Sequence, residues 1–496
     1  MEIAQALRNG LLNLGMQVFP VLAALVAVPF TIKAFGPEAF SVFSLGVTGI
    51  VLFNYLNFGV AQAATRSLAK LSPDTDGSEV NRIFFSGAVT ILAIGLIFSL
   101  LAHVFAPQLA EAVSKDLAMR PTAQRFFHAI GLASPLFLFI IYLRGCLESQ
   151  QLFKYSATNR AVLNSLIFLS PALPAVMGLG IETSLYVILT AHAASMLFLC
   201  VKTTRALSLK PRLLVSRREV GDMLTAGAWM TVSSLAAMLL LYADRFIISM
   251  LSGLTIVAYY IASFDLVSRL SLIYGSLTAA FFPAIAQWRD RGEHRKITGI
   301  LSFSTKAMFF VMIIVVTVIA TLSREILSLW ISAEYAEHAA LMLSVLSFGI
   351  FFNAMAVTPQ RALMAIGQER LVGTYVALQS LLYVLLSFAA VSRFGPMGAC
   401  VVFVIRGLLE FVALSVMLNA EYFRFGPVLL LRKVLPFALV LVGSMSLSFA
   451  LLDAPVLRKL IVLGVLLLVF PLFYYGRMLA QEDRLALKNK VMARMS

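Results

Sequence analysis

The sequence is poor in charged residues: only 13% of its 496 residues are Asp, Glu, Lys or Arg, whereas 60% are hydrophobic. A water-soluble globule of this length needs more polar surface than such a composition supplies. Cysteine is also scarce, and Cys146, Cys200 and Cys400 lie far apart in or beside apolar segments. This spacing indicates neither a disulfide framework nor a metal site, and we interpret all three as packing residues.

Local motifs of common enzymes are also absent. The sequence contains no Gly-Lys dipeptide and therefore no Walker phosphate loop, and it contains neither Gly-x-Ser-x-Gly nor His-Glu-x-x-His. His103, His128 and His192 lie in or near apolar runs without the spacing of metal ligands, so packing is the favoured interpretation for them. We expect no catalytic residue, no metal and no cofactor.

Long apolar runs are plentiful instead. Runs of about 20 residues or more, each long enough to cross a bilayer as a helix, occur roughly fourteen times. The expected class is an all-α polytopic membrane protein with about fourteen transmembrane helices. The runs cover residues 10–32, 40–62, 82–106, 124–146, 157–179, 183–204, 223–251, 254–286, 299–322, 337–363, 371–392, 397–419, 429–452 and 456–479.

The positive charge is distributed unequally between the two sides of these helices. The formal net charge of +15 would suggest nucleic acid in a soluble protein, but here the basic residues crowd connections on one side. The most basic connection holds Lys202, Arg205, Lys210, Arg212, Arg217 and Arg218. Cytoplasmic connections are enriched in Lys and Arg, so both termini are expected in the cytoplasm and no nucleic acid is expected as a partner.

Corresponding positions about 216 residues apart predict two related halves. At this offset Phe30 and Ile32 align with Phe246 and Ile248, and at an offset of 217 Arg144 falls on Arg361 and Gln151 on Gln368. Two lobes of this kind commonly hold a substrate between them. The expected domains are an N-lobe (1–205, helices 1–6), a basic cytoplasmic linker (206–221), a C-lobe (222–427, helices 7–12), an extra helix pair (428–480, helices 13–14) and a cytoplasmic tail (481–496).

Four basic residues lie clearly inside the expected spans: Arg245, Arg269, Lys306 and Arg406. All are in the second half, and the first half is predicted to have none. A charge at a helix centre costs about 2.5–3.5 kcal/mol on insertion scales, so such residues usually serve a protein or water-filled interior. Since guanidinium groups bind phosphate oxygens in a bidentate manner, a phosphate-bearing substrate is the preferred explanation.

A structural role for these charges is the alternative. Asp265 stands four residues before Arg269, and Glu410 stands four residues after Arg406, so each pair could be an ion pair that only holds helices together. Lys306 lies near the cytoplasmic start of its span and could extend to the surface. Asp244, next to Arg245, and Asp265 are candidates for gating or for contact with a glycan.

Amide side chains define two faces in the first half. Asn9, Asn13 and Gln17 recur every four residues, and Asn54 and Asn57 stand three apart. Amides both donate and accept hydrogen bonds, so these faces suit sugar hydroxyl groups. Hydrogen bonding between helices is the structural alternative.

Three short segments of the sequence are distinctive. They are Tyr242-Ala243-Asp244-Arg245-Phe246-Ile247-Ile248 with the Ser252-Gly253 turn and Val257-Ala258-Tyr259-Tyr260, then Phe35-Gly36-Pro37-Glu38-Ala39-Phe40-Ser41, and Asn57-Phe58-Gly59-Val60 with Arg66. These segments resemble the polysaccharide transport family of the multidrug/oligosaccharidyl-lipid/polysaccharide superfamily, and the likeness in layout covers essentially the whole chain. In this sequence Ser41 replaces a glycine that is usual in the family, and Asn57 stands where aspartate is frequent.

The resemblance implies a flippase of the O-antigen or exopolysaccharide type in a bacterial inner membrane. Its substrate would be a polyprenyl-pyrophosphate-linked oligosaccharide, moved from the cytoplasmic to the outer leaflet by alternating access. The family's cationic cavity would correspond to Arg245 and Arg269, with Arg406 and Lys306. Membrane lipids would be further partners, and a polysaccharide polymerase and chain-length machinery are candidates.

Two other functions stay open at this point. A multidrug extruder of the same superfamily would expel cations, and we would expect it to carry buried carboxylates without neighbouring bases. Asp244, Asp265 and Glu410 each have an arginine within four residues. A membrane polysaccharide polymerase or ligase would need a large outer loop with catalytic residues, and no connection in this sequence is long enough.

Overall fold

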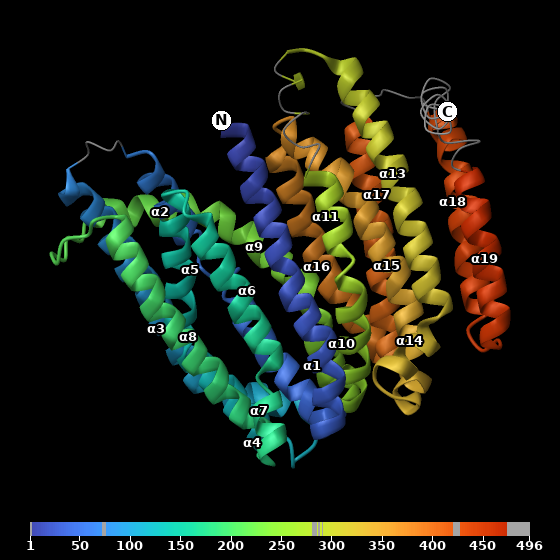
Figure 1. The fold of residues 1–496 in the computed structure, drawn as a ribbon, viewed down its shortest axis with the longest axis horizontal. Helices are drawn as coiled ribbons and strands as arrows, with labels where there is room; N and C mark the ends of the chain where they lie inside the picture. The colour runs from blue at the N-terminus through green and yellow to red at the C-terminus, as the bar shows by residue number, and fades with distance from the viewer. Residues whose placement is uncertain are drawn as a thin grey trace, which may run out of the picture. The chain divides into compact units, whose positions relative to one another are not determined.

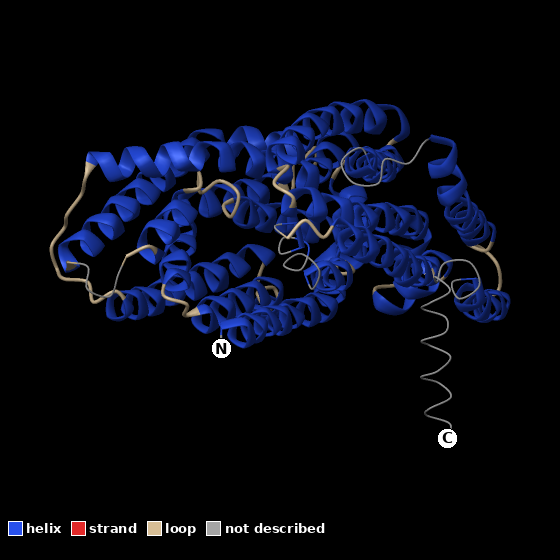
Figure 2. Ribbon diagram, turned by 90° about the horizontal axis from the view of Figure 1, so that it is seen from above, coloured by secondary structure: helices blue, strands red, loops and turns tan. Residues whose placement is uncertain are grey.

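The chain is helical throughout the part that the computed structural model describes, which comprises residues 2–71, 76–279, 285, 288–289, 291–419 and 427–473. Helices and their connections account for all of these residues, and no strand occurs among them (Figure 2). In chain order the helices are α1 (Glu2–Leu52), α2 (Val60–Ala69), α3 (Gly77–Val113), α4 (Arg120–Leu132), α5 (Ser134–Ser149), α6 (Phe153–Leu169), α7 (Ala172–Met177), the 3₁₀ helix η1 (Ile181–Thr183), α8 (Ser184–Ala206), α9 (Arg217–Ser252), α10 (Leu254–Ser268), α11 (Ser271–Ala279), α13 (His294–Thr321), α14 (Ser323–Trp330), α15 (Ala333–Ala365), α16 (Glu369–Phe394), α17 (Pro396–Leu418), α18 (Pro427–Ala450) and α19 (Val456–Phe473).

The apolar runs of the sequence form membrane-length helices, as expected. Ten helices of the described residues are long and apolar enough to cross a membrane, and an eleventh span results if the bent pair α4 and α5 is counted as one. The count is lower than fourteen partly because the first expected span and most of the second lie in the stretch Gly15–Leu52 of α1, which counts once although it is interrupted at Gly36. The chain is therefore a polytopic, all-α membrane protein.

Tight turns divide several of these helices. Within α1, Gly36 has φ 83° and ψ 167°, and Gly253 has nearly the same conformation between α9 and α10, with φ 92° and ψ 170°. This region of φ and ψ is accessible essentially only to glycine. In both places the helix is interrupted at a glycine, and the two glycines stand 217 residues apart.

The turn after α5 matches the turn after α15 with a different offset. Gln151 and Gly367 both have positive φ, at 56° and 88°, and each turn is closed by the next amide, which donates to Leu147 O (3.0 Å) or Leu363 O (2.9 Å). The structural offset here is 216, so Gln151 matches Gly367 rather than the Gln368 that the sequence comparison gave. With this offset Arg144 would match Gln360 rather than Arg361, because the stretch from Gly36 to Gln151 is one residue longer than that from Gly253 to Gly367.

By its contacts the chain divides into two compact units, and each is described separately. The first unit comprises Met1–Ala262 and Gly373–Ala399. In it α1 packs along α6, α3 packs on α4 and α5, and α5 also packs on α2 and α8 (Figure 1). The large buried side chains of α5, among them Phe137, Leu138 and Tyr142, form the centre of its core.

The basic segment between α8 and α9 is attached to α3 in the same unit. The amide of Asn81 donates to Lys210 O (2.8 Å) and Arg212 O (3.1 Å), and its oxygen accepts from the Lys210 N–H (3.1 Å). Further along, the Ser216 N–H donates to Ser86 Oγ (2.9 Å). Asn81 is 1% exposed, so this segment is fixed by a buried side chain.

The second unit comprises Ser263–Val372 and Cys400–Ser496. Helix α15 is the centre of this unit, and it packs on α11, α13 and α14, while α18 and α19 pack on α13 (Figure 1). Lys459, near the start of α19, is fully buried and donates to both carboxylate oxygens of Glu325 on α14, at 2.7 and 2.9 Å. It also donates to Leu452 O at 2.8 Å, so its three donors are all used.

Candidate functional site

A polar cavity of about 380 Å³ lies within the first unit. Its wall is formed by α1, α2, α5, α6 and α8 and by the chain between α1 and α2. Apolar residues such as Phe137 and Ile141 form part of the wall, which is typical of a ligand site with a few placed polar groups. Its polar and charged lining residues are Asn54, Tyr55, Asn57, Gln62, Thr65, Arg144, Glu148, Arg160, Asn164 and His192.

Two asparagines shape the part of the wall between α1 and α2. The Asn57 amide donates to Asn54 O (2.7 Å) and accepts from the Gly59 N–H (3.0 Å), and the Asn54 amide donates to Val51 O (3.2 Å). Phe58 and Gly59 both have positive φ, at 51° and 66°. Asn54 and Asn57, which the sequence predicts to face a glycan, thus also stabilise the turn between α1 and α2 through hydrogen bonds. Asn57 is 2% exposed.

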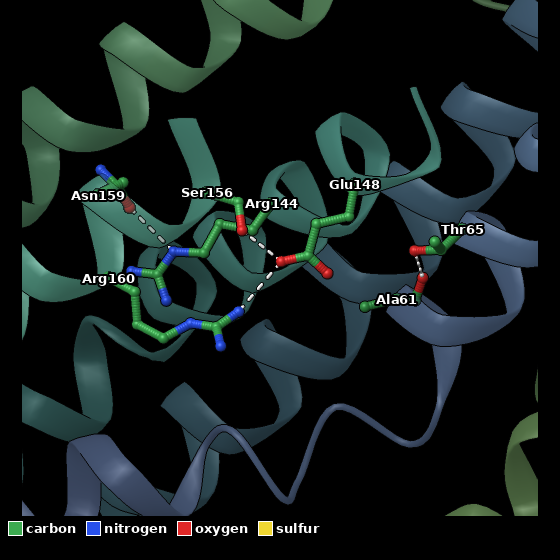
Figure 3. Close-up of polar contacts among 7 residues, drawn as sticks. All are labelled: Ala61, Thr65, Arg144, Glu148, Ser156, Asn159 and Arg160. Carbon is green, nitrogen blue, oxygen red and sulfur yellow. Dashed lines mark hydrogen bonds and ion pairs between the residues drawn. The ribbon is translucent and has the colours of Figure 1, made fainter. Parts of the chain in front are cut away.

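Arg144 is the most buried charged group of the cavity, at 9% exposure. Its Nε donates to Asn159 Oδ1 at 2.9 Å (Figure 3). The Asn159 amide in turn donates to Ser195 Oγ at 2.6 Å. These three residues come from α5, α6 and α8. The network fixes the plane of the guanidinium group and leaves its two terminal nitrogens without a hydrogen bond to any residue that the structure describes.

Glu148, one turn after Arg144, binds other partners. It accepts from Arg160 Nη2 at 3.1 Å and from the Ser156 hydroxyl, both on α6 (Figure 3). Two guanidinium groups and one carboxylate thus line the cavity, so the cluster has one excess positive charge. A buried excess of this sign favours an anionic ligand.

The prediction that the first half has no buried basic residue is therefore wrong. Arg144 stands near the end of the expected span 124–146 and was therefore not counted as lying clearly inside it. A local signal existed, since Arg144 is followed by Glu148 four residues later inside an otherwise apolar stretch, the same spacing as Arg406 and Glu410. The partners Asn159 and Ser195 come from other helices, and no spacing in the sequence indicated them.

Asp244, also in the first unit, is not among the residues that line this cavity. It is 1% exposed and accepts hydrogen bonds from the hydroxyl groups of Tyr260 and Tyr383 (the latter at 3.1 Å) and from the Arg245 N–H (2.8 Å). These contacts join α9, α10 and α16. The carboxyl group of Asp244 thus ties three helices of one unit together.

The predicted phosphate-binding residues have unlike surroundings. Arg245 is 7% exposed, and its guanidinium carbon lies 5.4 Å from the centre of the Tyr242 ring. Arg269 is half-buried and stands just after the end of α10, in the turn that leads to α11, with Asp265 half-buried one turn earlier. Lys306 is half-buried on α13.

Arg406 is held within the second unit by its neighbours. Its Nη1 lies 3.3 Å from Glu410 Oε2, which confirms the ion pair expected from their spacing. Its Nη2 donates to Asn353 Oδ1 on α15, and its guanidinium carbon lies 5.1 Å from the centre of the Phe403 ring. The structural alternative thus applies at least in part to Arg406.

The amide face of the first helix is only partly described. Gln17 is exposed on α1, whereas the side chains of Asn9 and Asn13 lie outside the described part of the structure. The expected cytoplasmic tail, 481–496, also lies outside the described residues.

Comparison with known proteins places this architecture in a family. The family model described as "Polysaccharide biosynthesis protein" matches residues 6–289, more than half of the chain. The chain belongs to this family. Proteins similar to this member of the polysaccharide biosynthesis family include a curated transporter and solved transporter structures.

A similar curated protein is the "Putative O-antigen transporter" of Shigella flexneri, 24% identical over 424 residues that cover 82% of this chain and 96% of the relative. Among solved structures, the lipid II flippase MurJ in an inward closed conformation has a TM-score of 0.70 at 14% identity, covering 95% of this chain and 99% of that one. An inward-facing multidrug resistance MATE transporter has a TM-score of 0.66 at 14% identity, covering 82% and 94%. At these identities the solved structures show a shared fold, and the named relatives are transporters rather than enzymes.

Proposed function

We propose that this protein is a flippase that moves a polyprenyl-pyrophosphate-linked oligosaccharide from the cytoplasmic to the outer leaflet of a bacterial inner membrane, for surface polysaccharide assembly. The match to the polysaccharide biosynthesis family over residues 6–289 carries the proposal. The name of the Shigella flexneri relative, an O-antigen transporter, supports it. The polar cavity of about 380 Å³ agrees with a hydrophilic cargo, which lipid alone would not accommodate.

In this proposal the cargo is moved by alternating access and undergoes no covalent change. Arg245 and Arg269, with Lys306 and Arg406, are the proposed contacts of the pyrophosphate, because cations in a low-dielectric site offset its charge. Arg406 already binds Glu410 and Asn353, so its contribution would require an exchange of partners. Arg245 and Arg269 are therefore the first residues to test.

The decisive experiment removes the gene and measures the lipid-linked oligosaccharide pool by mass spectrometry of a lipid extract. We expect completed lipid-linked repeat units to accumulate and surface polysaccharide to fall. Complementation with Arg245→Ala or Arg269→Ala should leave most of the accumulation, while Arg205→Gln, an exposed position on α8, should restore the normal pool. Normal export with both alanine variants would remove the proposed role of these arginines.

A multidrug extruder is the second candidate, favoured by the fold that the chain shares with a MATE transporter. Cationic-dye sensitivity of the same deletion cells separates the two functions. Unchanged dye tolerance with an enlarged lipid-linked pool supports the flippase. A normal pool with dye-sensitive cells would replace the flippase with the extruder.

A further inference from the structure

The cavity in the first unit has features that the proposed pyrophosphate site does not explain. We infer that it binds one acidic sugar residue of the transported glycan, with the carboxylate on Arg144 and the ring hydroxyl groups on neighbouring amides. This inference rests on the proposed function for its biological meaning. The chemistry of the site itself is independent of it.

The carboxylate position follows from the geometry of Arg144. Arginine has five N–H donors in a planar fork, and the Nε–H of Arg144 is used by Asn159 (2.9 Å). Because Asn159 is itself bound to Ser195, the plane of the fork is set before a ligand arrives. The outer edge of the fork is formed by the two terminal nitrogens of Arg144 and has no hydrogen bond within the described residues. Arg144 lines the cavity. Such an edge matches the two oxygens of a carboxylate.

The charge of the cluster favours a monoanion. Glu148 neutralises one of the two guanidinium groups, since it is bound by Arg160 at 3.1 Å and by Ser156. The remaining excess is one positive charge, which one carboxylate balances. A pyrophosphate has more than one negative charge, and the charged residues that line the cavity would leave the surplus uncompensated.

Size and hydrogen-bonding capacity point to a single sugar. A cavity of about 380 Å³ is near the lower end of the roughly 300–1,000 Å³ range of small-molecule sites, so it takes a sugar ring rather than a whole oligosaccharide. Gln62 and Asn164 line it, and neither has a hydrogen bond to the part of the chain that the structure describes. Their amides can therefore donate to and accept from ring hydroxyl groups, next to the apolar face of Phe137.

The test measures binding of sodium glucuronate to the purified full-length protein by titration calorimetry. Glucose is the neutral analogue and inorganic pyrophosphate is the alternative anion. We expect glucuronate to bind more tightly than glucose, and Arg144→Gln to weaken it at least about tenfold, because a charge-assisted bidentate contact is lost. Arg205→Gln is the matched control, since it removes an exposed arginine from α8 and should leave binding unchanged.

A second variant protects the test against misfolding of Arg144→Gln. Asn164→Leu removes an amide that has no hydrogen bond among the described residues, so it should fold, and it should weaken glucuronate binding about threefold or more. Equal binding of glucuronate and glucose, or unchanged binding in both variants, would overturn the inference. Pyrophosphate binding that depends on Arg144, without glucuronate binding, would assign the cavity to the lipid carrier's phosphates and would also overturn it.

The outcomes separate this inference from the proposed function. Arg144-dependent glucuronate binding together with a normal lipid-linked pool in the deletion cells would keep the acidic-sugar site and reject the flippase. Accumulation of lipid-linked repeat units without glucuronate binding would keep the flippase and reject the site.

Discussion

Two arginines in different units show how far spacing along a helix determines partners. Arg144 and Arg406 each hold an asparagine of another helix and each precede a glutamate by four residues. Arg406 binds its own glutamate, whereas Glu148 is bound by Arg160 and Ser156 of the next helix. The i,i+4 rule therefore predicted one ion pair correctly. The other depends on which side chains the neighbouring helix presents, and that information is not local in the sequence.

Lys459 carries a buried charge, and all three of its N–H donors are used in hydrogen bonds. It is 0% exposed, and its amine is 2.7 Å from Glu325. Removing one member of a buried pair leaves the other charge uncompensated, so Lys459→Met should lower the free energy of unfolding by roughly 3–5 kcal/mol. The thermal midpoint in detergent measures the loss.

The double variant Lys459→Met with Glu325→Gln should regain most of that stability, because no buried charge is left. The neighbouring pair of Arg324 and Asp453 is the control. Its side chains are 45% and 77% exposed, so Arg324→Gln should change stability by less than about 1 kcal/mol. A double variant as unstable as Lys459→Met would show that the lysine acts through packing instead.

At the scale of helices, the approach of α9 to the chain before α2 depends on two glycines. A Cβ atom on Gly227 would lie 2.0 Å from Phe58 O, and one on Gly59 would lie 2.5 Å from Gly227 Cα. Backbone atoms cannot move aside as a flexible side chain can. The close packing of these segments therefore requires glycine at both positions.

Gly227→Ala should destabilise the protein by about 1–3 kcal/mol, the usual range for overpacking. Gly221→Ala in the same helix should be neutral or stabilising by up to about 1 kcal/mol, because nothing lies within 4 Å of its added Cβ and alanine favours helix. Thermal midpoints of the two variants give the comparison. Equal shifts would mean that helix propensity, and not the close approach, governs both positions.

The turns explain why the sequence predicted the correspondence between the two halves only approximately. Gly36 and Gly253 share a conformation that essentially only glycine adopts, so this correspondence could be predicted. Gln151 and Gly367 also share a positive φ but differ in residue type, because glutamine tolerates the left-handed region at a modest cost. The backbone conformation therefore indicates an offset of 216 residues at this turn, whereas the sequence predicted 217.

For the whole molecule, hydrophobic length predicted the class and most of the helices. Within the described residues most of the apolar runs form helices, although some are divided between two, because no water is available in a bilayer to satisfy the backbone. The cavity could not be predicted, since its wall combines residues from 50 to 192 that only tertiary packing brings together. The boundaries of the predicted lobes remain a prediction.

The orientation of the chain in the membrane can be tested with single cysteines. Leu117 is 74% exposed between α3 and α4, and Leu213 is 71% exposed between α8 and α9. In a Cys200→Ser background, an impermeant maleimide should label Leu117→Cys on intact spheroplasts and Leu213→Cys only after lysis, as the positive-inside rule requires. Cys146 and Cys400 are buried and should react little. The reverse labelling pattern would place both termini outside.

The attachment of the basic segment to Asn81 bears on whether the chain could be encoded by two separate genes. Lys210 and Arg212 are held to α3 through their main-chain atoms, whatever their side chains do. A break in the peptide chain beyond Arg212 would thus remove covalent continuity while the segment stayed docked on the same partner. Two polypeptides split at this position would have to assemble with each other, because α9 at the start of the second packs on α2 and α3 of the first, while the basic segment that follows α8 would stay in place on α3.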